Sequence, residues 1–331
     1  MKEALFYRQM ENGVCECLLC PHRCKIAPGK EGLCMARRNI EGKLYAVNYA
    51  KTVSIAIDPI EKKPLYNFYP GTQILSIAPN SCNMKCPYCQ NYEISQKKSY
   101  TYELPVSELV RILKEHPSVG VAYTYTEPLT WYEYLLDAGY AVKEAGYKNV
   151  LVTNGMINEE PLKHLLPVID AVNVDLKSIR PEFYRELVKG DLETVKNFIK
   201  ILHSEGKHVE VTNLVIPGYN DTDEDFEKLT DFIAGVSPDI PVHFTRFFPH
   251  YKFYDLHPTP VERLKRAYEI AVKKLHYVYL GNVLTGREGN TYCPYCGNLL
   301  IERGYFYDVR ISGVEKGKCK KCGEKVNIVM D

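Results

Sequence analysis

Cysteine is the residue type of this chain with the clearest capacity for chemistry. The 331 residues contain 12 cysteines, which fall into three groups. Five lie at positions 15–34, three at 82–89 and four at 293–322. Disulfide frameworks spread their cysteines through short secreted chains, whereas grouped cysteines in a reducing compartment are more often metal ligands. The grouping therefore predicts metal sites.

The middle group offers three thiolates on one loop. Cys82, Cys86 and Cys89 have the spacing C-x3-C-x2-C and follow the apolar run 73–78. A closed structural zinc site uses four protein ligands. Three thiolates instead fit a [4Fe–4S] cluster with one iron left open. Because an open iron can bind and activate a ligand, this loop is the first candidate for a catalytic centre.

The last group predicts a zinc ribbon. It consists of two C-x2-C-G pairs, Cys293 with Cys296 and Cys319 with Cys322. Glycine after each pair permits the tight turn that directs backbone N–H groups at the thiolates. The runs 299–302 and 305–309 between the pairs are typical of short strands. Four thiolates form a closed site whose metal contributes folding energy to a small segment. Rubredoxin-like iron and free thiols are the alternatives.

The first group is denser and less specific. We favour four of its five cysteines as ligands of one site, namely Cys17, Cys20, Cys24 and Cys34. A Gly-rich turn at 27–32 would bring the last of them back to the others, and His22 could replace one ligand. We favour zinc, with a second iron–sulfur cluster or a set of free thiols as alternatives. The spacing does not decide between the two metals.

The chain between the first and last cysteine groups alternates strand-like and helical patterns, and these elements must position the candidate residues. Strand-like runs lie at 73–78, 119–125, 149–153, 171–176, 208–215 and 241–247. Helical periodicity lies at 106–115, 129–145, 160–166, 182–189, 192–203, 223–233 and 261–275. Repeated βα units with short loops predict a parallel sheet with right-handed crossovers. We therefore expect an α/β fold with a partial (β/α)6-type parallel barrel, to which 276–280 could add a strand.

Three parts follow from this pattern. Residues 1–71 are expected to form an N-terminal Cys-rich metal-binding segment with short strands, residues 72–283 the barrel, and residues 284–331 the zinc ribbon. Strand-like alternation also marks 43–49 and 53–57. The charged residues within 58–65 are expected to cap a surface turn.

Chemistry in a parallel barrel gathers at the carboxyl ends of its strands. The first predicted strand ends in the cysteine loop, and the next three are followed by Glu127, Asn154 and Lys177. Polar residues also follow the later strands, at 216–221 and 246–250. A capped surface turn would explain any one of these ends. Polar ends at matching positions around one cysteine loop favour a shared pocket.

The overall charge is nearly balanced, which argues against nucleic acid as a partner without excluding it. Lys and Arg number 42 against 41 Asp and Glu, which leaves a net charge of +1. No global field therefore draws the chain to nucleic acid or to a membrane surface. Its N-terminus shows no signal peptide, and no apolar run approaches the roughly 20 residues that span a bilayer. We expect a cytoplasmic protein without membrane association.

The motif Cys82-x3-Cys86-x2-Cys89, with Tyr88 before the last cysteine, resembles the radical S-adenosylmethionine (SAM) superfamily over roughly residues 72–250. Within it, the chain resembles the branch of the pyruvate formate-lyase activating enzymes. Several stretches resemble the radical SAM enzymes of the AmmeMemoRadiSam system more closely still, at 20–24, 58–65, 89–95 and 279–282.

This resemblance implies roles for the strand-end residues. The three cysteines would hold three irons, and the fourth iron would chelate the amine and carboxylate of SAM. Glu127 stands in Tyr125-Thr126-Glu127, where the family has a Gly-Gly-Glu motif that meets the SAM amine; both glycines are absent here. Asn154 and Lys177 resemble residues near the ribose and carboxylate of SAM.

The resemblance also extends to the rim of the site. It implies that 216–218 packs against the adenine, and that Tyr88 and His250 lie at the cofactors. A bound [4Fe–4S] cluster would donate an electron that cleaves SAM, and the resulting 5′-deoxyadenosyl radical would abstract hydrogen from the substrate. A reductant such as ferredoxin or flavodoxin would supply that electron.

The predicted function is thus a radical SAM enzyme with an unidentified substrate. The substrate could be a glycine of a partner protein, as in the activating enzymes. An RNA-modifying enzyme that docks through the ribbon is an alternative, supported by a local basic patch of Lys316, Lys318, Lys320 and Lys321. A non-catalytic zinc protein that binds partners is a third hypothesis. This third hypothesis does not explain the three-cysteine loop or the polar residues at the surrounding strand ends, because a non-catalytic scaffold needs neither.

Overall fold

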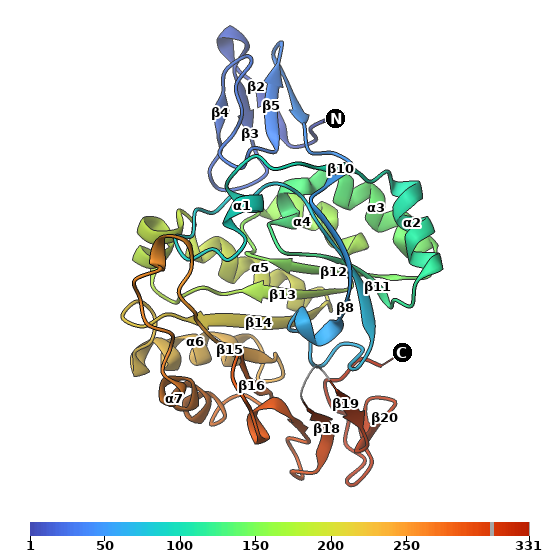
Figure 1. Ribbon diagram of the computed structural model, residues 1–331, viewed down its shortest axis with the longest axis vertical. Helices are drawn as coiled ribbons and strands as arrows, with labels where there is room; N and C mark the ends of the chain where they lie inside the picture. The colour runs from blue at the N-terminus through green and yellow to red at the C-terminus, as the bar shows by residue number, and fades with distance from the viewer. Residues whose placement is uncertain (305–307, 331) are drawn as a thin grey trace.

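An eight-stranded sheet forms the centre of the protein (Figure 1). The structure is a computed structural model that describes residues 1–304 and 308–330. The strand order is β16-β15-β14-β13-β12-β11-β9-β8, with every neighbouring pair parallel except β8 and β9. In chain order the strands are β8 (Ser54–Pro59), β9 (Gln73–Ala78), β11 (Gly120–Tyr123), β12 (Lys148–Thr153), β13 (Ala171–Asp175), β14 (His208–Val215), β15 (Val242–Arg246) and β16 (Val278–Gly281).

Helices connect the successive parallel strands. They are α2 (Val106–Glu115), α3 (Tyr132–Glu144), α4 (Glu159–Leu165), α5 (Leu192–Ser204), α6 (Asp223–Val236) and α7 (Val261–Ala271). The short helix α1 (Tyr92–Ser95) precedes α2, so at least one helix lies between each consecutive pair of parallel strands from β9 to β16, as a parallel sheet requires. The predicted α/β class with a partial parallel barrel is confirmed, and the run at 276–280 supplies the seventh parallel strand.

Local sequence explains these helices. The side chains of α5 that face the core recur at helical spacing, as Leu192, Val195, Phe198, Ile199 and Leu202, all of them buried. Helix α6 begins with a capping box, in which Thr222 accepts the backbone N–H of Asp225 and the Asp225 carboxylate accepts that of Thr222.

Two predicted helices differ in detail. The pattern at 129–145 begins with a 3-10 turn, η3 (Pro128–Trp131), before α3. The pattern at 182–189 forms a π-helix, η5 (Phe183–Val188), whose wider turn a helical period does not reveal.

The segment before β9 belongs physically to the barrel. β8 pairs antiparallel with β9 along its whole length. The following residues run against the inner strands, where Asn173 of β13 donates to the Pro64 carbonyl (2.7 Å). The Glu210 carboxylate of β14 accepts the backbone N–H groups of Tyr66 and Asn67. The predicted boundary at residue 71 remains a prediction. It would place residues 54–67 in the N-terminal segment, although they are hydrogen-bonded to the central sheet.

Small sheets form the two cysteine-rich ends, which lie at opposite ends of the molecule (Figure 1). The N-terminal strands are β1 (Lys2–Glu3), β2 (Tyr7–Gln9), β3 (Cys15–Cys17), β4 (Lys25–Ile26), β5 (Arg37–Ile40) and β6 (Lys43–Ala46), and β7 (Lys51–Thr52) pairs with β10 (Tyr102–Glu103). The C-terminal strands are β17 (Thr291–Tyr292), β18 (Leu299–Arg303), β19 (Val309–Ile311), β20 (Val314–Glu315) and β21 (Lys318–Cys319). Part of the strand predicted at 305–309 lies outside the described residues.

The two ends cover opposite faces of the barrel. In the N-terminal segment, the Leu19 carbonyl accepts the N–H of Asn158, which lies beyond the carboxyl end of β12. In the ribbon, Asn327 donates to the Asp239 carbonyl (2.8 Å), just before β15 begins. The N-terminal segment therefore shares the face to which parallel barrels assign their chemistry, and the ribbon lies on the other face.

Among the described residues, no helix has both the length and the apolar character needed to cross a bilayer.

Candidate active site

A cavity of about 230 Å³ lies beyond the carboxyl ends of β9, β11, β12 and β13. Its walls include six of the residues that the sequence singled out, Cys82, Cys86, Cys89, Glu127, Asn154 and Lys177. They come from four different strand ends, up to 95 positions apart in the chain. The parallel sheet thus brings the predicted residues to one cavity.

The three thiols are spaced more widely than ligands of a single ion. Zn–S bonds of about 2.3 Å in a tetrahedron would place thiolates about 3.8 Å apart. In the part of the chain that the structure describes, only the C-terminal cysteines form a group of ligand atoms all within 4.8 Å of one another. Cys82, Cys86 and Cys89 share one cavity without meeting that limit, and this arrangement fits a multi-iron cluster.

Polar groups approach two of these sulfurs. The Met84 N–H donates to Cys82 Sγ (3.4 Å), and Ser95 Oγ lies 3.3 Å from Cys89 Sγ. Such contacts stabilise thiolates and tune the metal that they bind. The donor set of this loop therefore fits an iron–sulfur cluster.

Glu127 is held rigidly in a buried position. It is 1% exposed, and its carboxylate accepts hydrogen bonds from Thr153 Oγ1 (2.6 Å), the Asn154 N–H (2.8 Å) and the Leu129 N–H (3.0 Å). Burial raises the pKa of Glu127 to about 7, although these hydrogen bonds act in the opposite direction. A cationic ligand beside it would favour the ionised carboxylate.

Lys177 stands at the next strand end and is paired. Its Nζ lies 3.0 Å from Asp175 Oδ2, and only 14% of its side chain is exposed. The backbone around it is fixed, because its N–H donates to Tyr184 Oη (3.0 Å) and its carbonyl accepts Asn220 Nδ2 (2.7 Å). Asn220 ties the predicted adenine-packing loop, 216–218, to this strand end. Asp175 also lines the cavity, although it is not among the predicted site residues. Its position at the carboxyl end of β13 is the feature of the sequence that could have identified it.

Asn154 links two loops of the site. Its Nδ2 donates to Asn83 Oδ1 (2.9 Å), and Asn83 Nδ2 donates to the Met156 carbonyl (2.8 Å). The cysteine loop is therefore fastened to the loop after β12. Sequence reasoning missed Asn83, because nothing within the cysteine motif marks a residue that is bonded to a loop some 70 positions away.

Tyr125 occupies a position that favours glycine. Its φ of 64° lies in the left-handed region, which costs a residue with a side chain energy that glycine avoids. Its carbonyl accepts Asn91 Nδ2 (2.6 Å), and its hydroxyl donates to Asp58 Oδ2. The Tyr125 side chain is therefore held by its hydrogen bond to Asp58. The family resemblance predicts glycine at this position of the motif.

Asp58, which binds the Tyr125 hydroxyl, belongs to a charged segment whose key side chains are buried. The prediction that the charges within 58–65 cap a surface turn is therefore wrong. Asp58 is 5% exposed and Lys63 is 1% exposed, and Lys63 Nζ lies 2.7 Å from Asp58 Oδ2. Burial acts to raise the pKa of Asp58, but hydrogen bonds from Lys62, Lys63 and Tyr125 outweigh it and hold the pKa well below its usual range. The charges compensate one another inside the protein, which a local pattern does not show.

Two predicted cofactor-binding residues lie outside the described cavity lining. The Tyr88 ring is buried between Phe183 and Phe253, at centroid distances of 6.4 and 5.9 Å. The His250 ring lies 5.8 Å from that of Tyr92. Contact of Tyr88 and His250 with a cofactor stays a prediction.

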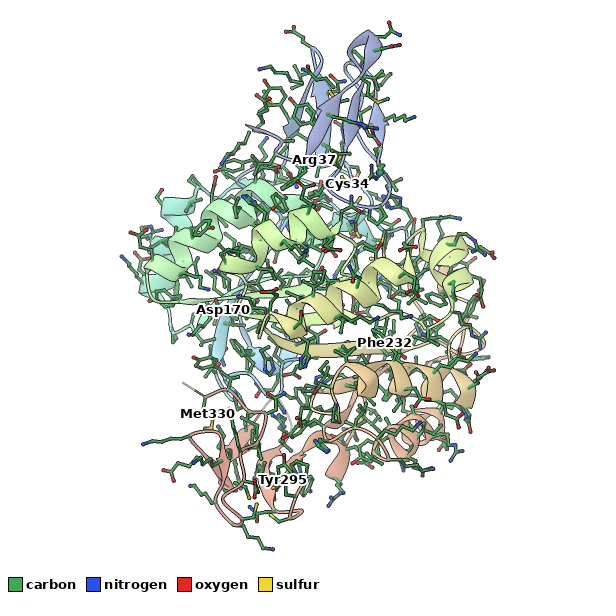
Figure 2. The ribbon with its side chains drawn as sticks, turned by 180° about the vertical axis from the view of Figure 1, so that it is seen from behind. Cys34, Arg37, Asp170, Phe232, Tyr295 and Met330 are labelled. Carbon is green, nitrogen blue, oxygen red and sulfur yellow. The ribbon has the colours of Figure 1, made fainter. Side chains whose placement is uncertain are left out.

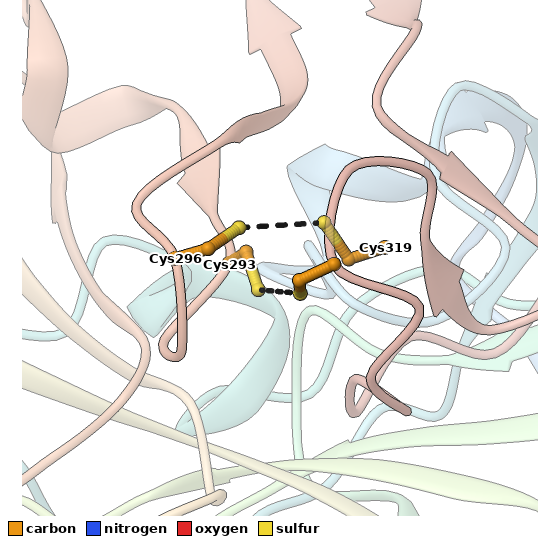
Figure 3. Close-up of side chains that lie close together, drawn as sticks. Cys293, Cys296 and Cys319 are labelled. Carbon is orange, nitrogen blue, oxygen red and sulfur yellow. Dashed lines mark hydrogen bonds between the residues drawn. The ribbon is translucent and has the colours of Figure 1, made fainter.

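The C-terminal cysteines form a compact group (Figure 3). Cys293 Sγ and Cys322 Sγ are 3.6 Å apart, and Cys296 Sγ and Cys319 Sγ are 3.7 Å apart. These distances match a tetrahedral site for one ion, estimated above at about 3.8 Å. The group fits the predicted zinc ribbon.

The predicted metal ligands of the N-terminal segment lie around one cavity. Cys17, Cys20, Cys24 and Cys34 line one small cavity, and His22 lines it with them. Cys15 lies apart from that lining, with its thiol 3.2 Å from the Gly42 carbonyl oxygen.

We predict that the two lysines on Asp58 differ in their effect on stability. Lys63→Met should lower the free energy of unfolding by about 3 kcal/mol, because it removes the buried partner of a buried carboxylate. Lys62→Met is the matched control; its side chain contacts the same carboxylate but is 47% exposed, so the change should stay below about 1 kcal/mol. Urea denaturation measures both, and equal effects would contradict the assigned role of Lys63.

Comparison with known proteins agrees with the geometry. Residues 76–233 match the family described as the Radical SAM superfamily. The uncharacterized protein MJ0808 of Methanocaldococcus jannaschii is 46% identical over the full length of both chains. Pyruvate formate-lyase 1-activating enzyme of Escherichia coli is 28% identical over 49% of this chain and 69% of its own length.

A solved structure supports the fold. The crystal structure of a radical SAM methyltransferase from Sphaerobacter thermophilus superposes with a TM-score of 0.51 at 16% identity, over 70% of this chain and 71% of that one. This likeness concerns the fold alone. The family match, the similarity to the activating enzyme and the cysteine loop at the carboxyl ends of the strands lead to one assignment. The chain belongs to the radical SAM superfamily and is an enzyme.

Proposed function

We propose that this enzyme binds a [4Fe–4S] cluster and SAM in the cavity at the strand ends, cleaves SAM reductively, and abstracts hydrogen from a substrate. The observation that carries the proposal is the shared cavity, in which three widely spaced thiols face Glu127 and Lys177. The cluster supplies the electron that cleaves SAM. The protein supplies binding, orientation and exclusion of water.

The residues around the thiols suit the ends of an amino acid. The Glu127 carboxylate would accept the ammonium group of SAM, and Lys177 would pair with its carboxylate. Opposite charges at two strand ends hold a zwitterion in a single orientation, and their effect is strongest where water is excluded. Asn154 and Asn83 keep the cysteine loop in place while this ligand binds.

A protein glycine is the substrate class that we favour. The similarity to a pyruvate formate-lyase activating enzyme supports it, because that name states an action on another enzyme. A one-electron donor such as ferredoxin or flavodoxin would supply the electron. We also propose that the C-terminal cysteines bind structural zinc, because their sulfur separations suit one tetrahedral ion.

The proposed chemistry has a direct test. Protein purified without oxygen and supplied with SAM and dithionite should release 5′-deoxyadenosine and methionine in equal amounts, measured by liquid chromatography. Cys86→Ala should abolish the release, because it removes one of three cluster ligands, and should leave the zinc content unchanged. Wild-type protein with a full iron content that releases neither product would overturn the proposal.

The role of Glu127 can be separated from cluster assembly. Glu127→Gln should weaken SAM binding about 10- to 100-fold, which corresponds to the loss of a charge-assisted hydrogen bond of about 1.5–3 kcal/mol. Iron content should stay unchanged, since Glu127 is not a ligand. Equilibrium binding of SAM measures the effect, and Glu115→Gln, on the exposed end of α2, is the control. An affinity equal to that of the wild type would remove Glu127 from the SAM site.

A further inference from the structure

A second cavity, lined by four cysteines, lies in the N-terminal segment. Cys17, at the end of β3, and Cys20, Cys24 and Cys34, in the loops that follow, surround a space of about 20 Å³. Figure 2 shows Cys34 and Arg37 where this segment meets the α/β core. Because the segment covers the carboxyl-end face of the barrel, this cavity lies on the same side as the three-cysteine loop.

The spacing of these thiols argues against a single ion. One tetrahedral zinc would draw four sulfurs to within about 3.8 Å of one another, as the ribbon sulfurs show at 3.6 and 3.7 Å. Within the N-terminal segment, all of which is described, no three cysteine, histidine or carboxylate ligand atoms lie within 4.8 Å of one another. The four thiols instead line one cavity, and no three of them come within that limit of one another, which is also true of Cys82, Cys86 and Cys89 in their own cavity.

Arg37 supplies a second, independent observation. It lines the cavity at 2% exposure, and its Nη1 is paired with the buried carboxylate of Glu133 (2.5 Å). Its Nε is buried and has no hydrogen-bond partner among the described residues. A buried charged donor left without an acceptor is costly, and each such group calls for an explanation. The sulfur atoms of an anionic cluster would be acceptors for this N–H.

We propose that Cys17, Cys20, Cys24 and Cys34 ligate a second [4Fe–4S] cluster, toward which Arg37 Nε donates. The sequence alone favours zinc here, and the spacing reverses that preference. Four protein thiolates leave no iron open, so this cluster would not bind a substrate as the first one would. The inference concerns a separate site and does not rest on SAM cleavage.

A residue of the three-cysteine loop, Asn83, also lines the N-terminal cavity. His22 Nε2 lies 2.7 Å from the Asn83 carbonyl oxygen, and both residues line the N-terminal cavity. Asn83 is also the residue after Cys82 and the hydrogen-bond partner of Asn154. A cluster in the N-terminal cavity would therefore support the loop that holds the first cluster.

Metal analysis of anaerobically prepared full-length protein tests the proposal. Wild-type protein should contain about eight irons per chain, as two four-iron clusters. The triple variant Cys82→Ala, Cys86→Ala, Cys89→Ala should retain about four irons and a [4Fe–4S] Mössbauer spectrum. The double variant Cys20→Ser, Cys34→Ser should also lose about half of the iron. Cys15→Ser, which keeps a hydroxyl near the Gly42 carbonyl, should retain all of it.

Two results would overturn the second cluster. A triple variant without iron and with two zinc ions per chain would show that the N-terminal site binds zinc. A triple variant without iron and with a single zinc would show that the four thiols are free. Should the double variant fail to fold, the wild-type iron count and the triple variant still decide. Because the triple variant lacks the first site, these outcomes do not depend on whether the protein cleaves SAM.

Discussion

The parallel sheet imposes the constraint on which the rest of the structure depends. Its seven parallel strands, β9 and β11 to β16, all end on one face, so the loops that follow β9, β11, β12 and β13 meet there whatever their distance along the chain. The cysteine loop, Glu127, Asn154 and Lys177 share one cavity for this reason. The N-terminal cysteine-rich segment lies on this face, and the ribbon lies on the opposite face.

Buried charges that compensate one another fasten these parts together. Arg37 of the N-terminal segment pairs with Glu133 of α3, and both are almost fully buried. Asp58 and Lys63 form a second buried pair, and Asp58 also accepts a hydrogen bond from the hydroxyl of Tyr125. Breaking such a pair leaves an uncompensated buried charge. The positions of the N-terminal segment and of Tyr125 are therefore specified by electrostatics as well as by packing.

The sequence predicts the repeated units well, because strand and helix periods are local properties. It also predicts the cavity residues that follow strand ends, such as Glu127 and Lys177. It does not reveal pairings across the chain, so Asp58 and Lys63 were expected at the surface and Asn83 was missed. Thiol spacing is likewise a product of the fold. The pattern from Cys17 to Cys34 leaves zinc and a cluster open, and the proposal of a cluster there rests on the three-dimensional separation of the sulfurs, which the sequence does not show.

The central claim is that the loop of Cys82, Cys86 and Cys89 presents an open iron to SAM beside Glu127 and Lys177. Electron paramagnetic resonance of the reduced protein tests it most directly. The variant Cys20→Ser, Cys34→Ser is used, because it is designed to remove the N-terminal cluster and keep the cluster of the Cys82 loop. Addition of SAM should shift the g values of the reduced [4Fe–4S] signal, because the ligand joins the open iron. A [4Fe–4S] signal that saturating SAM leaves unchanged would contradict the account.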